Sequence, residues 1–420
     1  MSTTEEAGSP ASPRPDLAGQ AEIQRRTVRV LMGAQILGAV AISLGVTVGA
    51  VAAVDISDSD AVGGAVLTAT AGGAAVGSAL LARIVERSGR RGSLGAGYLL
   101  AAAGALVAAV GIELGFWPVL LVGMLGFGIG SSTGLAARFA AADLAEPARR
   151  GRAVGTVLWA GTLGAVAGPN LAGPARDLTE RTTVSGNAGV FLTGTVLYTA
   201  AAAVVWSRLR PDPLVRAREL IGPHAGRPSG TGWAIVWVIP AARFAMIGVA
   251  LLHLAMVAVM SMSPVHLHHG GAGLRVIGLV ISAHIAGMYL LSPVFGVLVD
   301  RLGSARVLSA GAAISLGGAL VCASADQAES GVLGVGLVLI GLGWSAGLVA
   351  ASALLVAVVA PEDRARAQGS ADVLMNLAGA VGGLLAGGLM AVGSFTVLGV
   401  LVAAALAPYL LASLRPGRAR

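Results

Sequence analysis

Apolar runs of about twenty residues recur along this chain, and they restrict its possible folds more than any other feature. A run of that length is what an α-helix needs to cross a bilayer core of about 30 Å. Hydrophobic residues fill 55% of the 420 positions and charged residues only 12%, which is more apolar surface than a soluble core can bury. We therefore predict an all-α membrane protein with twelve transmembrane helices. They are expected at residues 30–53, 61–83, 93–113, 117–140, 153–174, 187–207, 240–263, 276–298, 306–324, 331–358, 369–391 and 395–413.

The arginines predict the orientation of these helices. All 28 basic residues are arginine, and most of them lie in the terminal segments and in every second connection. The positive-inside rule places those connections in the cytoplasm, and the even helix count places both termini there as well. We expect a multi-pass protein of a bacterial plasma membrane. Because topology accounts for the arginines, they do not indicate nucleic-acid binding.

The sequence repeats itself at one fixed offset. The stretch GSALLARIVERSGRR (77–91) matches FGVLVDRLGSAR (295–306), and PARRGRAVGTVLWAGTLGAVAGPNLAG (147–173) matches PEDRARAQGSADVLMNLAGAVGGLLAG (361–387). In both matches the aligned residues, such as Glu86 and Asp300, are 214 residues apart, so they indicate two homologous six-helix bundles around a central pathway. The predicted organisation is a disordered cytoplasmic tail (1–29), an N-terminal six-helix bundle (30–207), a cytoplasmic linker (208–239) and a C-terminal six-helix bundle with a short cytoplasmic tail (240–420).

The first repeated stretch resembles a loop of the major facilitator superfamily. That family carries G-x-L-x-D-R-x-G-R-R/K between its second and third helices and a degenerate copy between the eighth and ninth. Here the second copy, GVLVDRLG, is closer to the pattern, and the first has Ala82 for the glycine and Glu86 for the aspartate. Such an acidic side chain can pair with arginine across the two halves and dock on a helix N-terminus, closing an inner gate. The alternative is a loop that only anchors the orientation. The expected gate residues are Glu86, Arg87, Gly89, Asp300, Arg301 and Gly303.

This resemblance covers nearly the whole chain after residue 29 and implies a twelve-helix transporter that works by alternating access, as a monomer. A further element, GAVAGPNLAG (164–173), resembles the G-x-x-x-G-P-x-x-x-G motif of proton-coupled drug antiporters in that superfamily. Proline loosens the hydrogen-bond ladder of a membrane helix, and the glycines permit bending and close packing. The expected hinge residues are Gly164, Gly168, Pro169 and Gly173.

Methionine and histidine are crowded around residues 253–288. Met256 and Met260 lie one turn apart on one predicted helix, and His284 and Met288 have the same spacing on the next. Thioether and imidazole groups suit Cu(I), and the paired pattern resembles bacterial copper importers of the same superfamily, which implies these four residues as metal ligands. His253 lies one turn before Met256 and is expected in the same substrate site. The alternative is that the methionines only fill the core.

Other polar residues in the predicted membrane spans are candidates for the cavity lining or for proton coupling. Arg138 resembles the arginine that the superfamily often places in its fourth helix for proton coupling; the alternative is that it pairs with nearby Asp143 near the inner surface. Asp372 is expected either to carry protons or to pair with Arg87 or Arg91 in the gate, and His284 is a third proton-coupling candidate. Gln35 and Asn376 are expected to line the cavity.

No enzyme is expected, because no nucleophile–base constellation occurs in a plausible site. The glycine-rich stretches GFGIGSSTG (126–134) and GLGWSAG (341–347) lie inside predicted membrane helices without the strand and lysine of a nucleotide loop, so no cofactor is expected. Coupling to an ion gradient, most simply of protons, is the remaining energy source. Three functions stay open: copper import, proton-coupled efflux of drugs or metabolites, and a receptor or scaffold that has lost transport.

Overall fold

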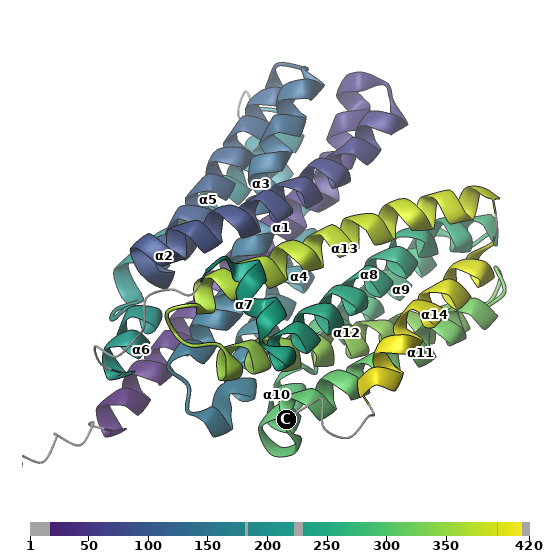
Figure 1. Cartoon of the computed structure of the whole chain (residues 1–420). Helices are drawn as coiled ribbons and strands as arrows, with labels where there is room; N and C mark the ends of the chain where they lie inside the picture. The colour runs from purple at the N-terminus through teal and green to yellow at the C-terminus, as the bar shows by residue number, and fades with distance from the viewer. Residues whose placement is uncertain (1–16, 181–183, 222–229, 393, 414–420) are drawn as a thin grey trace, which may run out of the picture.

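The computed structural model describes the chain except for residues 1–16, 181–183, 222–229, 393 and 414–420. In the described part every regular element is a helix, as predicted for an all-α membrane protein (Figure 1). The helices are α1 (Leu17–Ser57), α2 (Asp60–Glu113), α3 (Trp117–Asp143), the short 3-10 helix η1 (Pro147–Arg149), α4 (Arg150–Glu180), α5 (Gly186–Arg208), α6 (Pro213–Ile221), α7 (Gly232–Val238), α8 (Pro240–His269), α9 (Leu274–Tyr289), α10 (Ser292–Leu302), α11 (Ser304–Ser324), α12 (Ser330–Val358), α13 (Arg364–Val392) and α14 (Phe395–Ser413).

The twelve predicted crossings can be matched to the observed helices when α2 is counted as two crossings and α4 as one. Among the described residues, ten helical segments are long and apolar enough to cross a membrane. In this set α2 appears once, although its 54 residues make it long enough for two crossings at 1.5 Å per residue. The set does not include α4, which packs against α1 and α5 within the same bundle. Counting α2 twice and adding α4 gives twelve spans.

Two connections explain why the helix bounds differ from the predicted ones. Gly89 divides α2 between the second and third spans, with φ 69° and ψ −169°, a backbone conformation that glycine adopts without steric penalty. Between α9 and α10 the predicted eighth span is interrupted at Leu290 and Leu291. Pro293 lies in the first turn of α10, where the N–H that proline lacks would have no partner within the helix. The same proline prevents α9 from continuing into α10 as one regular helix, because its ring clashes with the preceding turn.

The helices form two bundles with separate apolar cores. Helices α1 to α5 surround a core that contains Phe127, whose ring packs edge-on against Phe191 and Tyr198 at centroid distances of 5.7 and 5.5 Å. Helices α8 to α14 surround a second core, which contains Trp344 and the apolar side chains around it. Since each core is built mainly from one half of the sequence, each bundle packs largely as a unit.

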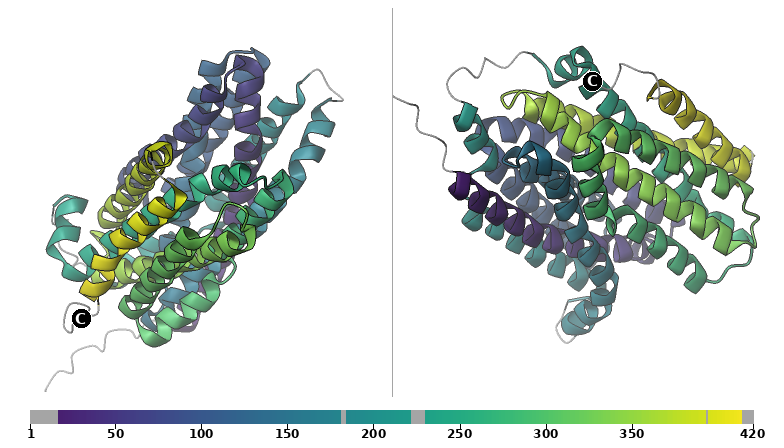
Figure 2. Two further views of the ribbon diagram at one scale, coloured as in Figure 1. Left: turned by 90° about the vertical axis from the view of Figure 1, so that its right-hand side faces the viewer. Right: turned by 90° about the horizontal axis from the view of Figure 1, so that it is seen from below.

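The two bundles touch at one end of the molecule. The main contacts between them join α2 to α13 and α4 to α10, near the arginine-bearing connections before and after those helices. We call this the arginine-rich end. Figure 1 shows the ribbons of the two bundles close together around α2, α4, α7 and α13 and diverging toward their far ends. The two further views in Figure 2 show the same two groups, with the first turns of α1 at the edge of the molecule.

Candidate functional site

A row of polar side chains on α13 faces the N-terminal bundle. Gln368, Asp372 and Asn376 follow one another at intervals of four residues, so they lie on one face of the helix. Each one contacts a polar group of the other bundle: Arg90, Arg138 and Ser78, respectively. We call these three residues and their partners the α13 polar row. It crosses the boundary between the halves where they meet.

Arg138 and Asp372 form the buried ion pair at the centre of this row. Arg138 is 2% exposed and Asp372 6%. The Arg138 guanidinium donates to the Asp372 carboxylate, and its Nε donates to Ser352 Oγ at 2.8 Å. It also lies over the Phe139 ring, 4.2 Å from the centroid. Charges this deep persist only when paired and hydrogen-bonded, so each of these two residues depends on the opposite half.

The observed partners of both residues differ from those that the sequence offers as alternatives, and proton coupling stays a prediction. Arg138 does not pair with Asp143, which is closer in sequence, and Asp372 does not pair with Arg87 or Arg91. Asp143 instead accepts a hydrogen bond from Arg90 Nε at 2.8 Å. The helix spacing explains the difference, because Arg138 and Asp143 are five residues apart on α3 and point in different directions.

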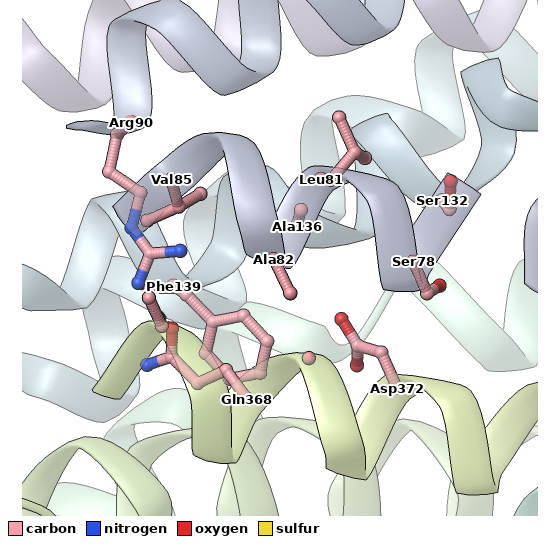
Figure 3. Close-up of a pocket in the computed structure, with 12 residues that line it drawn as sticks. Ser78, Leu81, Ala82, Val85, Arg90, Ser132, Ala136, Phe139, Gln368 and Asp372 are labelled. Atoms are coloured by element: carbon pink, nitrogen blue, oxygen red, sulfur yellow. Dashed lines mark hydrogen bonds between the residues drawn. The ribbon is translucent and has the colours of Figure 1, made fainter. Parts of the chain in front are cut away.

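A second buried charge cluster lies beside the first. Arg90 donates to both Asp143 and Gln368, and Arg364 Nη1 lies 4.0 Å from Asp143 Oδ1. A small cavity separates this cluster from Asp372 (Figure 3). Figure 3 shows Arg90 and Gln368 at one end of the cavity and Asp372 and Ser78 at the other, with Phe139 between them. Asp143 and Arg364 therefore add to the charges that hold the two halves together.

The predicted gate acids make related contacts across the halves. Asp300, at the end of α10, accepts hydrogen bonds from the backbone N–H groups of Gly151 and Arg152 at 2.8 and 3.1 Å and from Arg152 Nε at 3.0 Å. This carboxylate thus docks on the N-terminus of α4, where the helix dipole favours negative charge. Glu86 accepts from Arg366 Nε at 2.7 Å. Both ion pairs are related by the offset of 214 residues.

The other predicted gate residues are two arginines on the surface and two glycines that form turns. Arg87 and Arg301 are exposed. Gly89 and Gly303 both have positive φ, 69° and 91°, and each marks the turn after its acidic–arginine pair. A Cβ on Gly89 would also lie 2.5 Å from a carboxylate oxygen of Asp212, the residue that caps α6 and accepts from the Arg91 N–H at 2.7 Å.

Small residues bring the helices together at both contacts between the halves. A Cβ on Gly296 of α10 would lie 2.5 Å from the carbonyl oxygen of Gly151 in α4. At the equivalent contact of α2 with α13, the Ala82 side chain faces Gly369. The departure of Ala82 from the family pattern is therefore accommodated, because glycine stands on the facing helix.

The predicted hinge lies within one continuous helix, α4. Gly164 and Gly168 face α1, where a Cβ would meet the Val40 nitrogen at 2.7 Å and the Ser43 hydroxyl at 2.7 Å. Pro169 lies in the same helix, and a Cβ on Gly173 would meet no atom within 4 Å. In this state of the molecule Gly164 and Gly168 allow close packing between α4 and α1, and bending at Pro169 stays a prediction.

The Met/His set is distributed around α12. His284 is buried, and its Nδ1 lies 2.6 Å from the carbonyl oxygen of Leu337. Because a carbonyl only accepts, Nδ1 carries the proton and Nε2 keeps its lone pair; no hydrogen-bond partner of Nε2 occurs in the described part of the chain. Met256 and Met288 belong to the apolar core of the second bundle, and Met260 packs against it.

His253 is bound differently from His284. Its Nδ1 accepts a hydrogen bond from Trp344 Nε1 at 2.9 Å, so a neutral His253 carries its proton on Nε2. Both nitrogens are then unsuited to a metal ion, while Nε2 can donate to an organic solute. Among the described residues there is no group of three or more His, Cys, Asp or Glu side chains that can hold a metal, so a copper site here would need the thioethers as ligands.

Sequence reasoning missed Arg90, Asp143 as its partner, Gln368 and Trp344. The signal for Arg90 was present, because it follows Gly89 in the repeated loop. The signal for Gln368 was its four-residue spacing from Asp372 and Asn376. Trp344 lay in a stretch that the sequence explained only as helix packing, and nothing in its neighbours indicated a partner on α8.

Two bundles of this kind, joined by a linker and meeting at one end, define the class of membrane transporters built from paired six-helix repeats. The chain belongs to the major facilitator superfamily, whose family model matches residues 30–276 and 245–420. The resemblance inferred from the sequence is thus confirmed for the family.

The chain is similar to several members of that family. It is 34% identical over 385 residues to YddS of Bacillus subtilis, described as an uncharacterized MFS-type transporter, covering 91% of this chain and 88% of that protein. It is 27% identical over 368 residues to the riboflavin transporter RfnT of Brucella anthropi, covering 87% and 89%. Among solved structures, the human organic anion transporter MFSD10 has a TM-score of 0.71 at 16% identity, covering 93% and 99%, which supports the fold alone.

Proposed function

We propose that the protein moves a small solute across a bacterial plasma membrane by alternating access, driven by an ion gradient. The arginine-rich end is the cytoplasmic side, with both termini. Glu86, Asp300 and the α13 polar row close the pathway there, and Arg87 and Arg301 anchor the loops. The single observation that carries this proposal is that the buried Arg138–Asp372 pair joins the two halves at the end where they touch. Opening of that end must therefore separate Arg138 from Asp372.

Protons are the coupling ion in this proposal. Asp372 and Arg138 are each neutralised by a residue of the other half. When the halves part at this end, a buried carboxylate loses its counter-ion, and protonation is the least costly way to neutralise it. A proton taken up by Asp372 therefore favours the separated state. His284 is the weaker candidate, since its Nδ1 is already held by Leu337.

Copper(I) is the specific substrate in this proposal. His284 is suited to bind a soft ion, since donation from Nδ1 to a backbone carbonyl leaves Nε2 as a free donor atom, the arrangement usual for metal-bound histidine. Met288 follows one turn later, and Met256 and Met260 supply thioethers from α8. The four ligands would have to converge as α8 and α9 move around α12.

A flat organic solute is the second candidate, favoured by the similarity to a riboflavin transporter. His253 and Trp344 are hydrogen-bonded to each other, and Tyr289 packs edge-on against Trp344 at 5.8 Å. Aromatic faces and the ring N–H of His253 are suited to a conjugated ring system. Direction of transport is part of the test for both candidates.

Uptake by purified protein in proteoliposomes under an imposed proton gradient tests these proposals. Radiolabelled Cu(I) and riboflavin are the two probes, with Met256→Ala/His284→Ala as the metal-site variant and Met262→Ala as the matched control on α8. Copper transport by the wild type and the control, but not by the variant, is expected. Riboflavin transport without copper transport would replace copper by the organic solute, and no proton-driven flux of any solute would overturn the transport proposal.

A further inference from the structure

A groove runs along the arginine-rich end between the first turns of α1 and the start of α4. It is separate from the α13 polar row. Its volume is about 610 Å³, within the roughly 300–1,000 Å³ typical of pockets for drug-sized ligands. The lining residues are Gln20, Ala21, Glu22, Gln24, Arg25, Val28, Arg29, Leu144, Ala145, Glu146, Arg149, Arg152, Ala153 and Thr156. We call it the α1–α4 groove.

The groove combines an apolar wall with an excess of positive charge. Four arginines line it, against two glutamates. Glu22 is shared between Arg25 and Arg29, at 2.9 and 3.3 Å, so one carboxylate serves two guanidinium groups. Val28, Leu144 and Ala153 supply apolar surface to the lining. An occupant that matches both parts carries an anionic head and a hydrocarbon portion.

We propose that the α1–α4 groove binds the phosphate headgroup of an anionic phospholipid, with the upper part of an acyl chain along its apolar wall. The chain crosses a membrane, and the arginines lie at the end where helices leave it, so a lipid is the available molecule with both parts. Basic pockets between transmembrane helices are known to hold such headgroups. Arg25, Arg29 and Arg149 are more than half exposed, so a phosphate reaches them without unfolding.

The groove adjoins the inner gate through one residue. Arg152 lines the groove and also binds Asp300 at 3.0 Å. Its side chain is 52% exposed, so it can meet a phosphate while the backbone N–H groups of α4 still hold Asp300. A bound lipid therefore competes for one of the three hydrogen bonds of the gate acid and leaves two in place. Lipid composition should then bias the closure of the arginine-rich end.

Lipid binding to the purified full-length protein, measured by native mass spectrometry, tests the proposal. The probes are phosphatidylglycerol, phosphatidylcholine and free glycerol 3-phosphate. The variant Arg25→Gln/Arg149→Gln removes two groove arginines, and Arg26→Gln is the matched control, an exposed arginine on the same helix that does not line the groove. Each basic residue near an anionic lipid contributes about 1 kcal/mol, so the double variant should bind phosphatidylglycerol about thirtyfold more weakly.

The wild type and the control should prefer phosphatidylglycerol to phosphatidylcholine. Equal binding of both lipids, or equal binding by the double variant, would overturn the proposal. Glycerol 3-phosphate that binds as tightly as the lipid would assign the site to a free phosphate instead. Lipid that binds only after deletion of residues 1–16 would assign the groove to the terminal segment of the chain itself.

Discussion

At the residue scale, the most consequential contact is the pair of Arg138 and Asp372. Asp372→Asn removes the negative charge and keeps a hydrogen-bond acceptor, so Arg138 remains buried without an anion, at a cost of about 3 kcal/mol or more. We expect proton-driven uptake to be abolished while exchange of substrate across the membrane at equal pH continues. Both fluxes are measured on the same proteoliposomes. Loss of both together, in well-folded protein, would remove Asp372 from proton coupling.

The two proposed gate acids, Asp300 and Glu86, should stabilise the closed arginine-rich end by different amounts. Asp300 is nearly buried, with 4% of its side chain exposed, and accepts three charge-assisted hydrogen bonds, each worth about 1.5–3 kcal/mol. Glu86 is 33% exposed and accepts one, so a surface value of about 0.2–1 kcal/mol applies. Asp300→Asn should therefore open the arginine-rich end much more than Glu86→Gln, as read by spin-label distances across that end. Equal shifts would contradict this ranking.

The contacts of Glu86 and Asp300 across the halves could be predicted from the sequence, because a repeat at one offset makes the two acids equivalent by position. Glu86 and Asp300 correspond, as do Arg152 and Arg366, and the contacts cross between the two sets. The partner of Arg138 could not be predicted in this way. Its position 214 residues later is Ser352, which it does contact, but its counter-ion lies on a different helix, and helix rotation decides which acid an arginine meets. The Met/His set depends on the same unknown rotation.

At the element scale, the crossing of α4 with α10 depends on backbone contact. Gly296→Ala adds a methyl group where the Gly151 carbonyl lies, and overpacking of this kind costs about 1–3 kcal/mol. The cost falls on the closed state alone, so the open population should rise by a factor of about 5–150. Spin-label distances across the arginine-rich end measure it. Gly33→Ala, where a Cβ meets no atom within 4 Å, is the control and should change nothing.

The helix boundaries were predictable to the extent that they follow apolar length. Hydrophobicity predicts where a span lies but not where a helix bends. It therefore does not predict that two spans merge at Gly89 or that the helix breaks before Pro293. The α6 helix was also missed, since it is short and polar. It is stabilised by the Asp212 cap and by Leu214, which is buried against Val85 and Ala365, contacts that exist only in the folded molecule.

At the scale of the whole molecule, the proposed orientation gives a direct test. Cys322 is buried, so single cysteines introduced elsewhere can be read against a low background. In intact cells, Phe116→Cys and His268→Cys at the far ends of the bundles should react with a membrane-impermeant maleimide, and Arg208→Cys should react only after lysis. The reverse pattern would invert the topology and place the α1–α4 groove on the opposite side of the membrane.

The two contacts between the bundles are unequal, and this bears on how the molecule opens. Along α4 and α10 the backbones meet at Gly151 and Gly296. No side chain separates the helices at that point, so this contact is lost in one step when the helices move apart. Along α2 and α13 the close approach of Ala82 to Gly369 is flanked by polar side-chain contacts from Arg366 to Asn376, which can break one after another. Opening of the arginine-rich end should therefore begin along α2 and α13 and be completed only when the α4–α10 contact, with the docked Asp300, breaks in a single step.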